Sequence, residues 1–364
     1  MVTLKKIIDK KRLVVAFVII VLVAVAIISN PDMQGLLLGK DSIKVSFQSG
    51  VEHSALPYEN KMLLISAEGI RAVDEKGQNA WSVVYAMTSP QVLVKDGFIM
   101  VADVNGTQIN VYEKDKLLWN VKTEKEILTA KINDKGYVAV AADELGYKGV
   151  VEVFDNHGKE MFRWHSGEGY IGDIDIAHDG TLAVAQLMTD REAVYTRIMF
   201  VDPKGRKEAR CIGEIEGMTM RICFNENDDM IAIADCGLFC FDDDGEWRYS
   251  NDFDGRIPTA CNIENQDNMV FVFEGGLNNS VLECYSDNGK LRGKHEADGK
   301  IKTFDVNGEY ILYSTIGAVK RINPKGELKR EMPVNGDLKE MKMFFNRNSF
   351  ISLGGSSAEI LKIK

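Results

Sequence analysis

Histidine is scarce in this chain of 364 residues, and its five histidines show no metal-binding spacing. Common zinc sites place two histidines three or four positions apart on one side of a helix, as in H-E-x-x-H. No such pattern occurs here. We therefore interpret the histidines as surface or hydrogen-bonded side chains: His53, His157, His165, His178 and His295.

The motifs of common enzyme classes are also missing. There is no G-x-S-x-G nucleophile elbow, no P-loop and no dinucleotide-binding glycine pattern between a strand and a helix. The acidic runs "NENDD" and "DDDG" do not continue to the bidentate glutamate that a Ca²⁺ loop needs. Both coincide with turns of a repeat, where Asn, Asp and Gly are favoured. No catalytic, cofactor-binding or metal-binding residue, and no cofactor, is predicted.

An excess of basic charge is missing as well. The formal net charge is −10, with 27% charged and 45% apolar residues, which is an ordinary globular composition. The first twelve residues hold five bases and one acid, so the rest of the chain is still more acidic. Nucleic acids and anionic lipid headgroups require basic patches, so we exclude a nucleic-acid partner.

One long apolar run is present, the uncharged residues 13–29. As a helix this run covers about 26 Å, close to the roughly 30 Å of a bilayer core. The basic residues precede it, which predicts a cytoplasmic tail at 1–12, a transmembrane helix at 13–29, a linker at 30–42 and an extracytoplasmic remainder. The alternative is a cleaved signal peptide, because Ala24-Val25-Ala26 fits the cleavage pattern. The apolar run continues past that point, which favours an uncleaved membrane anchor.

After the linker, two classes of turn recur along the chain. Eight turns precede a strongly apolar strand, and seven turns follow the next strand. Their last residues are spaced by about 40 positions, which is the length of four short strands with their connections. The first class ends at Asn60, Gly97, Gly136, Gly180, Asp229, Asn268, Gly308 and Asn348. The second class ends at Gly77, Lys116, Gly158, Gly205, Gly245, Gly289 and Gly326.

Each unit is therefore predicted to hold four strands, a to d, from the centre outward. The b and c strands are apolar on both faces and the d strands are more polar, as in the blades of a β-propeller. The eighth unit lacks a d strand, and the alternating residues 43–49 lack a local partner. We predict an all-β, eight-bladed propeller over residues 43–364, closed by the pairing of strand 43–49 with strand 358–364. Seven blades are the alternative, if the first unit is not a true blade.

The four tryptophans each fall within six residues after a turn of the second class, where a large ring can cover the seam between two blades. In the first unit, "AVDEKGQNAW" contains Ala72, Asp74, Gly77 and Trp81. This unit resembles the tryptophan-docking repeat of quinoprotein propellers, and the repeat plan also resembles WD-repeat propellers. The whole chain resembles an uncharacterised family of single-pass, membrane-anchored propellers of Gram-positive bacteria. The resemblance implies a fold and no established activity.

Six cysteines cluster in units four to six, at positions 211, 223, 236, 240, 261 and 284. An extracytoplasmic domain permits disulfides. Cys223 and Cys261 fall on innermost strands of adjacent blades, and Cys236 and Cys240 flank one turn. The other interpretation is that all six are small buried apolar residues.

The composition and fold together indicate a membrane-tethered binding or scaffold module with a protein or cell-envelope ligand. A second hypothesis is an enzyme, quinoprotein-like or a hydrolase or lyase, acting at the central channel with Asp173, Asp175 and Asp305. A third is a sensor of cell-envelope components. For the binding module, the longest connections, at 142–149 and 187–196, are the candidate partner-binding loops. Their candidate contact residues are Tyr147, Met188, Arg191 and Tyr195.

Overall fold

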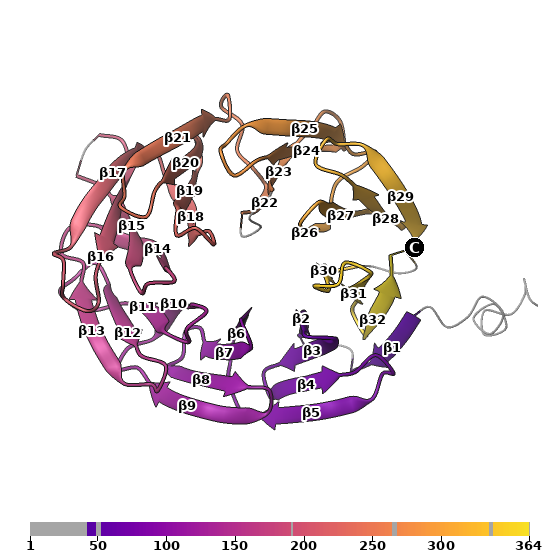
Figure 1. Ribbon diagram of the computed structural model, residues 1–364, viewed down its shortest axis with the longest axis horizontal. Helices are drawn as coiled ribbons and strands as arrows, with labels where there is room; N and C mark the ends of the chain where they lie inside the picture. Colours follow the sequence, from indigo (N-terminus) through magenta and orange to yellow (C-terminus); the bar gives the residue numbers. More distant parts are fainter. Residues whose placement is uncertain (1–41, 49–51, 191, 264–267, 335–337, 364) are drawn as a thin grey trace, which may run out of the picture.

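The computed structural model describes residues 42–48, 52–190, 192–263, 268–334 and 338–363. Within these ranges every regular element is a β-strand, and the strands form eight four-stranded antiparallel sheets. The sheets are arranged as blades around a central opening (Figure 1). The eight-bladed propeller predicted from the turns is confirmed, and the seven-bladed alternative is wrong.

The first four blades follow one another along the chain, each built from its innermost strand outward. Their strands are β2 (Ser54–Tyr58), β3 (Lys61–Ser66), β4 (Gly69–Val73) and β5 (Asn79–Val84); β6 (Pro90–Lys95), β7 (Phe98–Asp103), β8 (Gln108–Glu113) and β9 (Lys116–Lys122); β10 (Ile127–Ile132), β11 (Val138–Ala142), β12 (Val150–Phe154) and β13 (Glu160–His165); and β14 (Tyr170–Ile176), β15 (Leu182–Met188), β16 (Tyr195–Val201) and β17 (Arg210–Glu216).

The last four blades have the same order, except that the outermost strand of blade 8 comes from the start of the described chain. Their strands are β18 (Thr219–Phe224), β19 (Met230–Ala234), β20 (Gly237–Phe241) and β21 (Trp247–Asp252); β22 (Ala260–Asn262), β23 (Met269–Glu274), β24 (Ser280–Tyr285) and β25 (Leu291–Glu296); β26 (Thr303–Asn307), β27 (Tyr310–Thr315), β28 (Ala318–Ile322) and β29 (Leu328–Pro333); and β30 (Glu340–Met343), β31 (Ser349–Leu353), β32 (Ser357–Lys362) and β1 (Ser42–Ser46).

The ring is closed by β1, which pairs antiparallel with β32 from Ser42↔Leu361 to Ser46↔Ser357. This is the pairing that the unpartnered strand indicates in the sequence. The predicted tail at 1–12, the predicted transmembrane helix at 13–29 and the predicted linker up to residue 41 lie outside the described residues. In the ranges that are described, no helix is long and apolar enough to cross a membrane.

The hydrophobic core lies between the blades, because each blade packs face to face with its neighbours. The middle strands β11 and β12 are buried at every position, as expected for strands covered on both faces. One core cluster joins Ile65 and Ile70 of blade 1 to Ile99 and Val101 of blade 2. In contrast, the outermost strand β29 is exposed at most positions.

The c–d turns fit against the outer strand of the preceding blade. Gly158 and Gly289 have φ angles of 79° and 75°, a region that favours glycine. A Cβ atom at Gly158 would also lie 2.8 Å from the Trp119 ring, so Trp119 covers the seam between blades 2 and 3. Trp247 differs from this expectation, since 54% of its surface is exposed.

The propeller has two faces that differ in their connections. We call the face of the a–b and c–d turns, such as 59–60 and 155–159, the turn face. The opposite face carries the b–c and d–a connections, such as 143–149 and 189–194, and we call it the loop face. Strand order places the start of β1 and the end of β32 on the turn face.

Candidate functional site

The two predicted partner-binding loops lie on the loop face, at 143–149 in blade 3 and 189–194 in blade 4. Tyr147 is 51% exposed, and its ring packs on His165 with 4.5 Å between ring centroids. Arg191 lies outside the described residues. Met188 and Tyr195 correct the prediction, because they are paired strand residues that are only 2% and 3% exposed. Strands β15 and β16 extend further than the sequence indicates, which shortens the connection and buries both side chains.

Large exposed apolar side chains are concentrated on the loop face. The most exposed are Leu277, Leu145, Ile316 and Val84, all at least 86% exposed. They are densest in blades 3 to 5, where we group them as the apolar arc: Leu128, Leu145, Tyr147, Tyr170, Val194, Met218 and Met220. Exposed apolar side chains grouped on one face are typical of interaction surfaces.

Acidic residues lie close to the apolar arc, and three of the described bases beside it already have partners. Lys125 pairs with Glu144 at 3.4 Å. The ammonium of Lys148 lies 4.4 Å from the centre of the Tyr170 ring. The guanidinium of Arg197 pairs with Glu168 at 2.6 Å and Glu214 at 3.4 Å. Further acids of the same loops are Asp143, Asp190, Glu192 and Glu216. The arc is therefore an apolar surface in an acidic setting.

The central channel is lined by the innermost strands and by their turns. One hollow of about 590 Å³ lies among β2, β6, β22, β26 and β30. A second hollow, of about 750 Å³, lies among the a–b turns of blades 1 to 5 on the turn face. The exposed Phe345 borders both hollows.

The acids expected at the channel join the blades to one another. The carboxylate of Asp173 accepts the backbone N–H of Ile222 at 2.9 Å, and that of Asp175 accepts the N–H of Phe224 at 2.7 Å. Asp305 accepts the N–H of Met343 at 2.7 Å. Each bond connects the innermost strand of one blade to that of the next. Burial raises the pKa of Asp175 to about 6 and also raises the pKa of Asp305.

In most blades the c strand carries a charged residue at an equivalent position. Its partner across the sheet is a residue of the d strand. In five blades the d-strand neighbour carries the opposite charge and forms an ion pair. The pairs are Glu152–Arg163 at 2.8 Å, Arg197–Glu214 at 3.4 Å, Glu283–Lys294 at 3.7 Å, Lys320–Glu331 at 3.7 Å and Lys44–Glu359 at 3.0 Å. In blades 1, 3, 4, 6 and 7 the register between the c and d strands shifts at a β-bulge. The charged c-strand residue lies one position before the last pair ahead of that shift.

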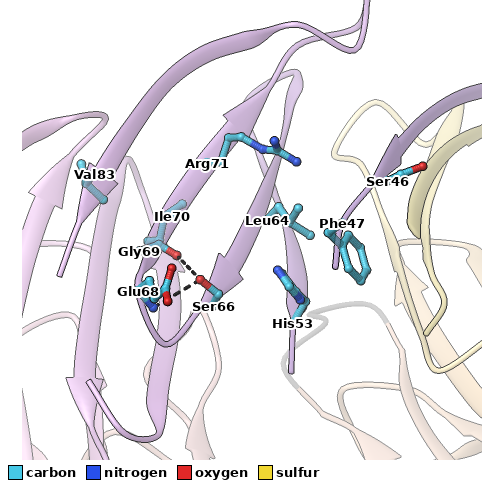
Figure 2. Close-up of a pocket in the computed structure, with 10 residues that line it drawn as sticks. All are labelled: Ser46, Phe47, His53, Leu64, Ser66, Glu68, Gly69, Ile70, Arg71 and Val83. Atoms are coloured by element: carbon cyan, nitrogen blue, oxygen red, sulfur yellow. Dashed lines mark hydrogen bonds between the residues drawn. The ribbon is translucent and has the colours of Figure 1, made fainter. Parts of the chain in front are cut away.

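Blade 1 departs from this series. Its charged c-strand residue is Arg71, and the residue opposite is the uncharged Ser82. Within the described part of the chain, Arg71 has no hydrogen-bond or ion-pair partner. Its side chain lies in a pocket of about 280 Å³ between β1 and the loop-face end of blade 1 (Figure 2). This pocket was not predicted from the sequence. The signal was an opposite charge eleven residues downstream, present for Glu152, Glu283 and Lys320 and absent for Arg71.

The histidines and cysteines take varied positions. His178 bonds the Asp134 carboxylate, and His295 lies between the Gly326 carbonyl and the Tyr313 hydroxyl. In the described ranges no three His, Cys, Asp or Glu side chains are grouped to hold a metal ion. All six cysteines have free thiols. Cys211 is exposed on the outer strand β17, which corrects the interpretation that all six are buried.

Solved structures confirm the propeller fold at low sequence identity. The chain is similar to BamB from Moraxella catarrhalis, with 13% identity, a TM-score of 0.56 and coverage of 88% of this chain and 100% of that chain. It is similar to the computationally designed Ika8 protein, with 14% identity, a TM-score of 0.61 and coverage of 87% and 98%. It is also similar to the C-terminal WD40 domain of Sif2, with 13% identity, a TM-score of 0.62 and coverage of 88% and 97%.

Sequence comparison gives a family but no characterised relative. No curated protein matches the chain. Residues 40–363 match the sequence model of a family described as a family of unknown function, DUF5711. The match spans all eight blades, including the closing strand β1.

Proposed function

We propose that this chain, which belongs to the DUF5711 family of unknown function, is a membrane-anchored extracytoplasmic propeller that binds a protein partner through its loop face. The single observation that carries the proposal is the concentration of exposed apolar side chains on that face. Loops held by a rigid scaffold are where proteins commonly place their binding residues.

The orientation of the two faces supports this assignment. The predicted anchor at 13–29 precedes β1, and β1 begins on the turn face. The thirteen-residue linker at 30–42 reaches at most about 45 Å when fully extended. The turn face is therefore directed to the membrane, and the loop face is directed away from it. A partner in the envelope reaches the loop face without displacing the anchor.

The side chains of the apolar arc indicate which kind of protein surface binds there. Leu145 and Tyr147 offer apolar surface, and the exposed acids Asp143, Asp190 and Glu192 lie in the same loops. A protein surface that combines apolar side chains with lysine or arginine complements both features. We place the contact here rather than in the channel because Asp173, Asp175 and Asp305 already accept backbone N–H groups.

Site-specific photo-crosslinking in intact cells tests this function. A photoreactive residue at Leu145, on the loop face, is expected to give a discrete crosslinked product with one protein. The matched control is Leu328, which is 50% exposed on the outer strand β29 and should give none. A photoreactive residue at Leu277, also on the loop face, reports on the same contact. In a Leu145→Ser/Tyr147→Ser double variant, crosslinking from position 277 should be lost while the melting temperature changes little. Equal products from positions 145 and 328 would contradict the proposal.

A further inference from the structure

The pocket beside Arg71 contains a positive charge that no residue of the described ranges compensates. An arginine side chain stays charged at all physiological pH values and offers five N–H donors. Arg71 is partly buried, and removing such a group from water is unfavourable unless it gains a partner. In the other charged blades the d strand supplies a partner, whereas Ser82 supplies none. The site is therefore a cation without its counterion.

The walls of the pocket come from both sides of the ring closure. Figure 2 shows the Arg71 side chain reaching from β4 across the pocket toward Phe47, which follows β1. The rings of Phe47 and His53 are stacked with centroids 4.2 Å apart. Leu64 and Val83 add apolar surface from blade 1. A ligand in this pocket touches an aromatic pair on one side and aliphatic residues on the other.

The charges at the pocket limit the kind of anion that fits. Arg71 is the basic partner, and Glu68 lies at the exposed rim of the same pocket. A doubly charged phosphate would meet one arginine and one nearby carboxylate, which is a poor balance. A single carboxylate matches the planar guanidinium through two parallel hydrogen bonds. The hydroxyl group of Ser66 is occupied, since it accepts the N–H of Glu68 at 3.3 Å and contacts the Gly69 carbonyl at 3.4 Å.

We propose that this pocket binds a small monocarboxylate with an aromatic or apolar body, with Arg71 as its counterion. The volume of about 280 Å³ accommodates a ligand of one ring. The site lies at the seam of blades 8 and 1 and does not depend on the partner-binding function of the apolar arc in blades 3 to 5. A ligand held between β1 and β4 also stabilises the closure of the ring, because it binds only when both strands are in place.

Thermal unfolding of the full chain in detergent, with benzoate as probe, tests the site. Benzoate is expected to raise the melting temperature with a saturable concentration dependence. Benzamide, which has the same shape without the charge, and inorganic phosphate at the same ionic strength are expected to give no such rise. Equal effects of benzoate and benzamide would overturn the proposal, and so would equal effects of benzoate and phosphate.

Three variants connect the effect to Arg71. Arg71→Gln should weaken benzoate binding at least tenfold, whereas the matched control Arg330→Gln, on the exposed strand β29, should leave it unchanged. Ser82→Glu places a carboxylate opposite Arg71, as in blade 7, and should abolish the benzoate effect in a folded protein. Ser82→Glu also provides the test if Arg71→Gln fails to fold. Undiminished benzoate binding in Ser82→Glu would show that the guanidinium is not the binding group.

Discussion

Individual acids of the innermost strands connect neighbouring blades in this protein. Asp175 is an example, since its carboxylate is buried and accepts the N–H of Phe224 in the next blade. Burial disfavours the charged carboxylate and raises its pKa to about 6, although Lys131 opposes the shift. In the unfolded chain an aspartate has a pKa of about 3.9. The folded state therefore holds this proton to higher pH than the unfolded state does.

This difference in pKa predicts a pH-dependent effect of Asp175→Asn. The contribution of Asp175 to stability is full below about pH 4 and falls as the pH rises through 6, by on the order of 2–3 kcal/mol. Asparagine keeps an oxygen that accepts the Phe224 N–H and cannot ionise. Relative to the parent, the variant should gain about that much stability between pH 4 and pH 7 in urea denaturation. Asp243→Asn, in an exposed turn, is the control, and an equal pH trend in both variants would contradict the prediction.

The strands and their turns could be predicted from the sequence because the geometry of a tight turn requires particular residue types. The positive φ angles at Gly97, Gly136 and Gly180 fall at the turns that were counted as repeats. The ends of β15 and β16 could not be predicted in this way. Met188 and Tyr195 are buried because they pair with each other across the sheet, and no turn residue marks where that pairing stops.

The candidate site was predictable only in part for the same reason. Tyr147 was identified because it lies in a long connection, and it is exposed as expected. The pocket at Arg71 depends on the register of β4 against β5, which places Ser82 opposite the arginine. It also depends on β1, which reaches blade 1 only after the chain has closed a ring of eight blades. Side chains that meet through ring closure leave no local pattern.

At the scale of one element, β1 closes the ring, and two proline substitutions test this. The N–H of Phe47 donates to the Ser356 carbonyl at 3.0 Å. Hydrogen-bonded pairs alternate along an antiparallel ladder, so the N–H of Val45 also faces β32 and that of Ser46 faces outward. Val45→Pro should lower the free energy of unfolding by about 1–3 kcal/mol, because it removes a ladder donor and leaves the carbonyl of β32 unpaired. Ser46→Pro should cost about 1 kcal/mol or less. Equal unfolding midpoints for the two variants in denaturant would show that β1 is not needed for closure.

For the whole molecule, the positions where the described chain enters and leaves the propeller determine which face is free. The start of β1 and the end of β32 lie on one face because both flank the c–d position of blade 8. The exposed apolar residues Leu145 and Leu277 lie on the other face. An anchor attached before β1 therefore leaves the apolar face free. The same anchor attached on the loop face would cover it.

The proposed orientation of the whole molecule across a membrane rests on the bases that precede residues 13–29. By the positive-inside rule, we expect Lys5, Lys6, Lys10, Lys11 and Arg12 to stay on the cytoplasmic side and the propeller to be directed outward. A phosphatase that is active only after export, fused after Lys364, should be active, and a fusion with a fluorescent protein that folds only in the cytoplasm should be dark. Replacing all five bases with glutamine should reduce phosphatase activity and increase fluorescence, because the charge bias that sets the orientation is lost. A fluorescent fusion to the parent chain would place the propeller in the cytoplasm and refute the orientation proposed for the loop face.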